Sequence, residues 1–338
     1  MSVTATTARR NAAWSGRWRI RVVIATLVAI AGAALIWRLG PWSPPGFTEY
    51  RMLSTTDIPA AVAVSPQGAV WFTIEFSDAI GVLRNGGIER LPKGKENVEP
   101  LGLAVDAEGY AWFTDSPARA VARISPEGAI TAFTLSMPLA RLGRLAVAPA
   151  GAVWFADALT PSVTRLERGV FTRHQASSFG AAPFGVAVSG DGTVWATLPN
   201  VNKLLRISPA RELTEFDVPT RGSGLSDLAV DASGAVWFVE LRANKIGRFA
   251  GGQFTEFAVP TPSAGLTALA VAPDGAVWFT ELRAHALGRL RDGRVTEFPL
   301  PRADARPFGI AVDPGNNVWY TDLSGWLGKL SAERARSH

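Results

Sequence analysis

Tryptophan recurs along this chain at an almost constant interval, and this periodicity limits the available folds more than any other feature. It stands at Trp71, Trp112, Trp154, Trp195, Trp237, Trp278 and Trp319, so the successive gaps are 41, 42, 41, 42, 41 and 41 residues. A period of about 40–45 residues is typical of propeller blades and of long helical repeats. The content of each period decides between these two architectures.

Each period contains four short apolar segments separated by turns. In the sixth period these segments are 269–272, 276–284, 287–290 and 295–298, with Pro-Asp-Gly and Arg-Asp-Gly turns after the first and the third. β-Branched and aromatic runs bounded by such turns are typical of strands, and the repeats lack a sustained helical period of 3.6 residues. Seven repeats of four strands predict an all-β, seven-bladed β-propeller over residues 47–330.

The two ends of the repeat region predict how the ring closes. The last third segment, Leu327–Leu330, is not followed by a fourth segment, whereas the fourth-segment pattern occurs at Phe47–Tyr50, before the first tryptophan. All-β folds avoid unpaired sheet edges. We therefore expect Phe47–Tyr50 to complete the seventh blade as its outer strand.

The first 46 residues differ in kind from the repeats. Five arginines stand without any acidic residue in 1–21, and an apolar run from Val22 reaches Trp42 if Arg38 extends its charged end to the interface. We interpret 1–21 as a basic cytoplasmic tail, 22–42 as a transmembrane signal-anchor and 43–46 as a linker. By the positive-inside rule, this predicts a single-pass inner or cell membrane protein whose propeller lies on the periplasmic or extracellular side.

A cleaved signal peptide is the alternative for this segment. Ala29-Ile-Ala31 and Ala31-Gly-Ala33 offer small-residue cleavage sites, and cleavage would make the protein secreted. The apolar run continues past both sites, which favours the anchor. At the other end of the chain, 331–338 is polar, and we expect a frayed tail there.

Charge and cysteine content exclude several function classes. The chain has 34 Lys plus Arg against 29 Asp plus Glu, and residues 1–38 hold six Arg and no acid, which leaves 28 against 29, or −1, for the rest. A nucleic-acid binder needs a basic face, so we expect no nucleic-acid partner, and we expect a monomer. The absence of cysteine excludes disulfides, thiolate metal sites and a cysteine nucleophile.

Acidic residues recur three positions after the tryptophan. They are Asp115, Asp157, Glu240, Glu281 and Asp322. The loops that follow second strands share one face of a propeller, so we expect these carboxylates to gather at one channel mouth. Carboxylate oxygens there predict a site for Mg²⁺, with Ca²⁺ as the alternative. The competing interpretation is that each carboxylate accepts backbone N–H bonds in its own loop.

Two residues depart from the consensus of the repeats and are our candidates for catalysis. Glu75 lies four positions after its tryptophan, which would turn its side chain to the other face of a strand. His285 stands in a loop where other repeats have Asn244 or Arg119. Either residue could serve as a general base. A solvated surface role is the alternative for His285.

The repeat sequence closely resembles the virginiamycin B lyase (streptogramin lyase) family. The resemblance covers 47–330 and is carried by Trp-Phe-Thr-Glu, by Asn-Lys-Ile-Gly-Arg at 244–248 and by Phe-Thr-Glu-Phe-Ala-Val-Pro-Thr-Pro at 254–262. It implies a seven-bladed propeller that linearises a cyclic depsipeptide by Mg²⁺-assisted elimination at the ester. Such a reaction needs a base that removes the proton α to a carbonyl and a cation that stabilises the enolate.

The residues that the resemblance assigns to catalysis are not matched. The family's two key histidines stand in Pro-His-Gly or Pro-His-Ala turns that open a first strand, whereas the matching turns here are Pro183-Phe184-Gly185 and Pro307-Phe308-Gly309. Two hypotheses remain. The chain is either a lyase-like enzyme that opens a cyclic ester or lactone, or a membrane-tethered propeller that binds a small ligand or a protein without catalysis.

Overall fold

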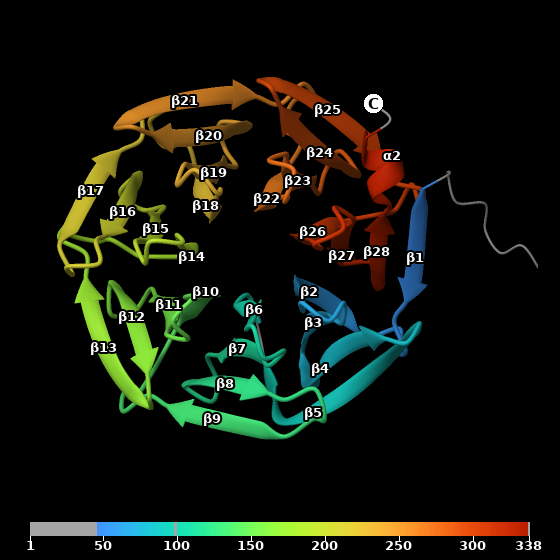
Figure 1. Cartoon of the computed structure of the whole chain (residues 1–338), viewed down its shortest axis with the longest axis horizontal. Helices are drawn as coiled ribbons and strands as arrows, with labels where there is room; N and C mark the ends of the chain where they lie inside the picture. Colours follow the sequence, from blue (N-terminus) through green and yellow to red (C-terminus); the bar gives the residue numbers. More distant parts are fainter. Residues whose placement is uncertain (1–45, 98–99, 337–338) are drawn as a thin grey trace, which may run out of the picture. The chain divides into compact units, whose positions relative to one another are not determined.

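The computed structural model describes residues 46–97 and 100–336, which form seven four-stranded sheets arranged in a ring (Figure 1). Within each sheet the neighbouring strands are antiparallel, and six of the sheets take their strands in chain order. The first strands face the middle of the ring and the fourth strands form its rim. The predicted seven-bladed β-propeller is therefore confirmed.

The blades have the following bounds. Blade 1 contains β2 (Ile58–Val64), β3 (Val70–Glu75), β4 (Ser77–Arg84) and β5 (Gly87–Asn97). Blade 2 contains β6 (Leu103–Val105), β7 (Ala111–Asp115), β8 (Ala120–Ile124) and β9 (Ile130–Thr134). Blade 3 contains β10 (Leu142–Val147), β11 (Val153–Asp157), β12 (Ser162–Glu167) and β13 (Val170–Gln175). Blade 4 contains β14 (Val186–Val188), β15 (Val194–Leu198), β16 (Lys203–Ile207) and β17 (Leu213–Asp217).

The remaining blades follow the same plan. Blade 5 contains β18 (Leu225–Val230), β19 (Val236–Glu240), β20 (Lys245–Ala250) and β21 (Gln253–Ala258). Blade 6 contains β22 (Leu266–Val271), β23 (Val277–Glu281), β24 (Ala286–Arg291) and β25 (Arg294–Pro299). Blade 7 contains β26 (Pro307–Val312), β27 (Val318–Asp322), β28 (Trp326–Leu330) and β1 (Phe47–Arg51).

The ring closes as the sequence predicts. β1 pairs antiparallel with β28, from Phe47 opposite Leu330 to Arg51 opposite Trp326, and so becomes the outer strand of blade 7. The strand is one residue longer than the predicted Phe47–Tyr50. The first and last strands of the described chain thus share one blade.

The repeated tryptophan lies in the core between adjacent blades. Trp278 of blade 6 is buried together with Ile310 and Tyr320 of blade 7, and Trp71 of blade 1 is buried with Phe113 of blade 2. Each indole therefore serves two blades, which explains why the residue returns once per repeat.

The arginine that recurs in third strands packs on the same indoles. Arg289 pairs with Trp278 across β23 and β24, and its guanidinium carbon lies 5.8 Å from the centre of the indole ring. The corresponding distance between Arg248 and Trp237 is 5.4 Å. A cation over an aromatic face is attracted by the ring's quadrupole, so this repeated arginine stabilises the blade.

In five of the seven blades, a threonine in the second strand ties the first strand to the next blade. Thr197 Oγ1 accepts a hydrogen bond from Gly185 N (2.8 Å) in its own blade and donates one to Ser226 O (2.6 Å) in the following blade. Five of the seven second strands carry this residue, at Thr73, Thr114, Thr197, Thr280 and Thr321. These hydroxyls form a ring of inter-blade bonds just outside the channel.

The structure describes the chain on the C-terminal side of the propeller up to residue 336. The predicted cytoplasmic tail 1–21, the anchor 22–42 and the linker up to residue 45 lie outside the described residues. Among the described residues, no helix has the length and apolarity needed to cross a membrane. At the other end, the expected frayed tail needs correction: α2 (Ala332–Arg336) is a short helix with Ala332 and Ala335 buried, and its first residue follows Ser331, which donates to Gly46 O.

We predict that Thr197→Val destabilises the propeller. Valine removes a buried donor and acceptor and leaves Gly185 N and Ser226 O unsatisfied, a change that costs about 1–3 kcal/mol and should lower the melting temperature by several degrees. Thr131→Val, on an exposed outer strand, is the matched control. Equal melting temperatures for the two variants would show that the hydroxyl ring contributes nothing to stability.

Candidate functional site

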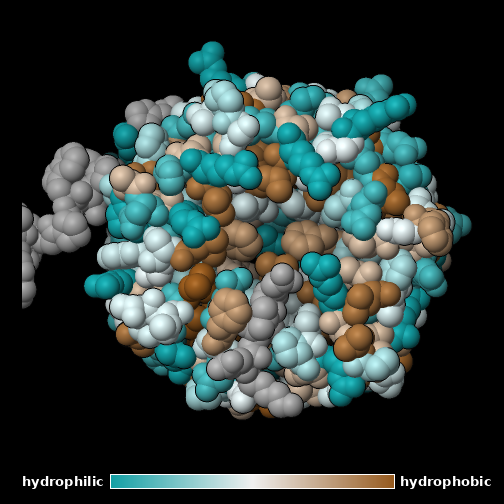
Figure 2. Space-filling model, turned by 180° about the vertical axis from the view of Figure 1, so that it is seen from behind, coloured by the Kyte–Doolittle hydropathy of each residue, from teal (hydrophilic) through white to brown (hydrophobic). Residues whose placement is uncertain are grey.

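One end of the ring, which we call the upper face, carries the loops after second strands and the connections from each fourth strand to the next blade. Loops of both kinds line a cavity of about 230 Å³, whose walls include Leu101, Arg141, Leu142, Gly143, Ala158, Ala182, Pro183, Phe184, Pro199 and Asn200. A second, more open hollow lies between blades 4 and 5. An end of the ring shown in Figure 2 is hollowed at its centre, with hydrophobic side chains around the hollow. The upper face therefore offers sheltered apolar surface.

The structure does not bring the predicted metal ligands together. Each of the five acids ends a second strand in a different blade and is buried. Among the residues that the structure describes, no group of three or more Asp, Glu or His side chains could hold a metal ion. Second strands lie one strand away from the channel, so the ends of these strands ring the channel at a distance instead of meeting at its mouth.

Two of these acids hold their own loops. Asp115 Oδ1 accepts a hydrogen bond from Ala118 N (2.9 Å), and its other oxygen lies 3.2 Å from the buried ammonium of Lys93 in the neighbouring blade. Asp157 Oδ1 accepts from Leu159 N (3.1 Å) in the same way. For Asp115 and Asp157, the loop-capping interpretation is the one that the contacts support.

Asp322 belongs to an ion cluster in blade 7. It accepts a hydrogen bond from Ser324 N (2.8 Å) and pairs with Arg302, which also reaches Glu49 on the outer strand at 3.2 Å. Tyr320 donates to Glu49 at 3.0 Å. Arg302 therefore neutralises both carboxylates, and Asp322 is held inside the blade.

Glu240 and Glu281 are buried without any such partner. Both oxygens of each carboxyl lack a hydrogen bond, and both residues are fully buried. Burial, together with the charge of nearby Glu297, raises the pKa of Glu281 to about 8. Burial and Glu256 raise the pKa of Glu240 to about 7. Because the five acids end strands in five different blades and form no group that could hold a metal ion, this donor set does not fit Mg²⁺ or Ca²⁺.

The two candidates for catalysis lie in separate blades. Glu75 ends β3 and is half-buried, paired with Ile58 of the first strand. His285 is exposed, and its Nδ1 bonds to Ala305 O. Because a carbonyl oxygen only accepts, Nδ1 must carry the hydrogen.

Comparison with its counterparts in other blades explains the position of His285. Asn244 occupies the matching place in blade 5, with a φ of 56° against 53° for His285, and its side chain donates to Val259 O (3.1 Å) and Thr261 O (3.0 Å). Asn202 makes the equivalent bonds in blade 4. His285 thus stands where other blades use an asparagine to hold the inter-blade connection, and a role as catalytic base stays a prediction.

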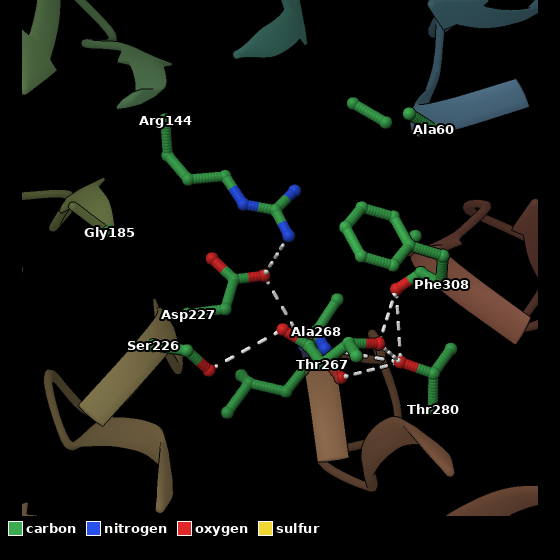
Figure 3. A network of polar contacts seen from close by, with 12 residues as sticks. Ala60, Arg144, Gly185, Ser226, Asp227, Thr267, Ala268, Thr280 and Phe308 are labelled. Carbon is green, nitrogen blue, oxygen red and sulfur yellow. Dashed lines mark hydrogen bonds and ion pairs between the residues drawn. The ribbon is translucent and has the colours of Figure 1, made fainter. Parts of the chain in front are cut away.

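A charged pair inside the channel was not predicted. Arg144 of β10 and Asp227 of β18 extend toward each other across the channel (Figure 3), with 3.4 Å between Nη2 and Oδ2. Asp227 Oδ2 also accepts from Leu269 N at 3.4 Å. Burial raises the pKa of Asp227, and the charge of Arg144 opposes that rise.

A double departure from the repeat marks these two residues. Where the second strand has its threonine, the facing first-strand position is Gly or Ala; at Gly185 an added Cβ would lie 2.7 Å from Ser226 O and 3.0 Å from Thr197 Oγ1. In blades 3 and 5 the threonine is replaced by Ala156 and Val239, and the first strand carries Arg144 and Asp227. Aligning the repeats at both positions would have revealed the pair.

The two Pro-Phe-Gly turns stand beside this pair at the upper end of the channel. Phe184 lines the 230 Å³ cavity, and its carbonyl accepts a hydrogen bond from Arg144 N at 2.9 Å. The carbonyl oxygen of Phe308 accepts a hydrogen bond from Thr267 Oγ1 (2.8 Å). The aromatic ring of Phe308 extends toward the middle of the channel in Figure 3. Both phenylalanines are half-buried. The channel mouth therefore combines aromatic rings with a single ion pair.

Comparison with known families decides the family of this chain. The model of the "Virginiamycin B lyase family" matches residues 38–198 and 143–335, which is most of the chain. The chain belongs to the virginiamycin B lyase family. A virginiamycin B lyase of Nocardia farcinica (strain IFM 10152) is 36% identical over 203 residues, which are 58% of this chain and 69% of that protein.

Solved structures of the virginiamycin B lyase family agree with this assignment. A catalytically inactive histidine-to-alanine variant of the Staphylococcus aureus virginiamycin B lyase, with quinupristin, has a TM-score of 0.80 and 29% identity, covering 84% of this chain and 98% of that one. A streptogramin B lyase structure has a TM-score of 0.79 and 27% identity, covering 84% and 96%. A histidine is therefore required in the S. aureus enzyme, whereas both histidine turns of the resemblance hold phenylalanine here.

We predict that Glu281→Gln makes the propeller less sensitive to alkaline pH. The folded chain holds the Glu281 proton more tightly than the unfolded chain does, so this contribution to stability is complete below pH 4.5 and is lost as the pH rises to about 8. Glutamine mimics the neutral carboxyl, so the variant should melt several degrees higher than the parent at pH 8.5, and the gap should shrink at pH 5.

Melting curves across this pH range provide the measurement, with the exposed Glu212→Gln as control. If the melting temperatures of Glu281→Gln and the parent differ by the same amount at all pH values, the raised pKa of Glu281 in the folded chain is wrong.

Proposed function

We propose that this chain is a non-catalytic, ligand-binding member of its family that holds a compact cyclic or linear peptide at the upper mouth of the channel. The observation that carries this proposal is the pair of Pro-Phe-Gly turns, 183–185 and 307–309, in the positions where the resemblance implies the catalytic histidines. Phenylalanine has no titratable group, so neither turn can remove a proton. Aromatic rings in a sheltered hollow do supply contact area for a ligand.

The surroundings of the mouth support binding. The 230 Å³ cavity beside Phe184 is lined mainly by apolar side chains, with Arg141 and Asn200 as polar groups. Ligand sites of proteins commonly combine an apolar lining with a few oriented polar groups. The acids that would hold a metal are engaged or buried elsewhere in their blades.

One observation favours ring opening as a second candidate function. Asp227 is a buried carboxylate in the channel with a raised pKa, and Arg144 beside it could stabilise the developing negative charge of an enolate. In this version, Asp227 and not Glu75 or His285 would take the proton α to the carbonyl. Asp227→Asn should then abolish ring opening while the fold is kept.

We also propose that residues 22–42 tether the propeller to the membrane. The support is the apolar run, which follows five arginines in 1–21 and contains a single arginine, Arg38, near its other end. A cleaved and secreted form is the alternative outcome, and the mass of the mature protein in membrane and soluble fractions distinguishes the two.

We predict that the protein binds quinupristin and leaves it intact. Binding should be saturable in calorimetry, and chromatography with tandem mass spectrometry should recover the cyclic compound with and without Mg²⁺. Chromatographic separation is needed because elimination at an ester leaves the mass unchanged. Phe308→Ala should weaken binding about tenfold, since an aromatic contact contributes roughly 0.5–1.5 kcal/mol beyond its buried area.

Phe179→Ala is the matched control, because Phe179 is fully exposed on an inter-blade connection. If the parent opens the quinupristin ring and Asp227→Asn does not, the second candidate function, ring opening, replaces the proposed non-catalytic binding. Absence of binding in calorimetry would overturn the proposal.

A further inference from the structure

The channel layer that holds Arg144 is otherwise made of very small residues. The matching first-strand positions in the other blades are Ala61, Gly102, Gly185, Ala268 and Gly309, with Asp227 as the remaining one. Arg144 and Asp227 stand on either side of blade 4, whose Gly185 adds no side chain. The ion pair is therefore the only charge that the described first strands place in this layer.

Arg144 has more donors than its partner uses. A guanidinium carries five N–H donors in a planar fork, while the ion pair to Asp227 is a single contact at 3.4 Å. Nε of Arg144 is buried without a hydrogen bond. Several third-strand arginines share an unbonded Nε, but Arg289 and Arg165 lie over indole rings, which accounts for their orientation.

The residues that precede Arg144 in its strand line the cavity on the upper face. Leu142 and Gly143, the two residues before Arg144, line it, and so does Phe184, whose carbonyl holds Arg144 N. The cavity measures about 230 Å³. Since an apolar protein cavity of about 150 Å³ takes up benzene, this space can hold one aromatic side chain.

We propose that Arg144 is the receptor for a ligand carboxylate and that the cavity lined by its chain neighbours Leu142 and Gly143 takes the aromatic side chain of the same ligand. The ligand class is a peptide or peptide-like acid with a C-terminal aromatic residue. Asp227 orients the guanidinium from one side and leaves the remaining donors to the ligand. This inference rests on the proposed binding function and names the chemistry that the site selects.

The site should discriminate an acid from its ester. A carboxylate accepts two charge-assisted hydrogen bonds from a guanidinium, whereas an ester carbonyl accepts weaker ones and brings no charge. Arg141 at the cavity wall adds a second positive charge near the same place. We expect a preference of about tenfold or more for the acid, because charge-assisted bonds are roughly twice as strong as neutral ones.

The experiment measures calorimetric affinities for two pairs of probes. The first pair is N-acetylphenylalanine and its methyl ester, and the second is quinupristin and the acid made by saponifying its lactone. The parent should prefer the acid in each pair. Arg144→Gln combined with Asp227→Asn, which leaves no unpaired buried charge, should bind acid and ester equally.

The control is Arg168→Gln, an exposed residue in a turn of blade 3. It should keep the preference for the acid. Arg144→Gln alone serves as a second variant, and circular dichroism confirms that each variant is folded.

Each result decides one or both proposals. Quinupristin binding without any acid preference overturns the carboxylate receptor and leaves the binding function intact. The protein could instead bind N-acetylphenylalanine in a way that depends on Arg144 and fail to bind quinupristin. This result overturns the proposed binding of quinupristin and supports Arg144 as the carboxylate receptor. An absence of binding for all four probes overturns both.

Discussion

The hydroxyl that joins neighbouring blades constrains the whole inner part of this propeller. Thr197 Oγ1 and its counterparts each satisfy an amide N–H of one first strand and a carbonyl of the next. The facing residue is glycine or alanine in every blade that has this threonine, and at Gly185 even an added Cβ would lie 2.7 Å from Ser226 O. This layer of the channel wall is therefore made of glycine and alanine, except in the two blades that lack the threonine, where Arg144 and Asp227 stand.

Blades 3 and 5 lack this threonine, and they are the blades that place a charged pair in the channel. Ala156 in place of threonine lets Arg144 N bond directly to Phe184 O, so the inter-blade link is kept by the backbone alone. The side chain of Arg144 is then free to point inward and meet Asp227. The same position of the repeat thus holds an inter-blade hydroxyl in five blades and allows a charged side chain in the channel in the other two.

The architecture could be predicted from the sequence because its causes are local and repeated. A tryptophan shared by two blades must return once per blade, and an outer strand missing at one end must come from the other. The site could not be predicted in the same way. The loops after second strands share one face of the propeller, which predicts that Asp115 and Glu281 gather at the channel mouth, but second strands stand one layer outside it. Arg144 and Asp227 escaped notice because each looks like one polar residue in an ordinary strand until its partner position is compared.

The closure of blade 7 has a mechanical consequence. Ser331 N bonds to Gly46 O, so the start of β1 and the end of β28 leave the sheet at the same edge. A force applied to the chain before residue 46 acts first on the pairing of β1 with β28, which comprises the five residues Phe47 to Arg51. The other blades bear this force only after that pairing. The β1–β28 pairing that closes the ring is therefore also the first part of the propeller to bear a mechanical load.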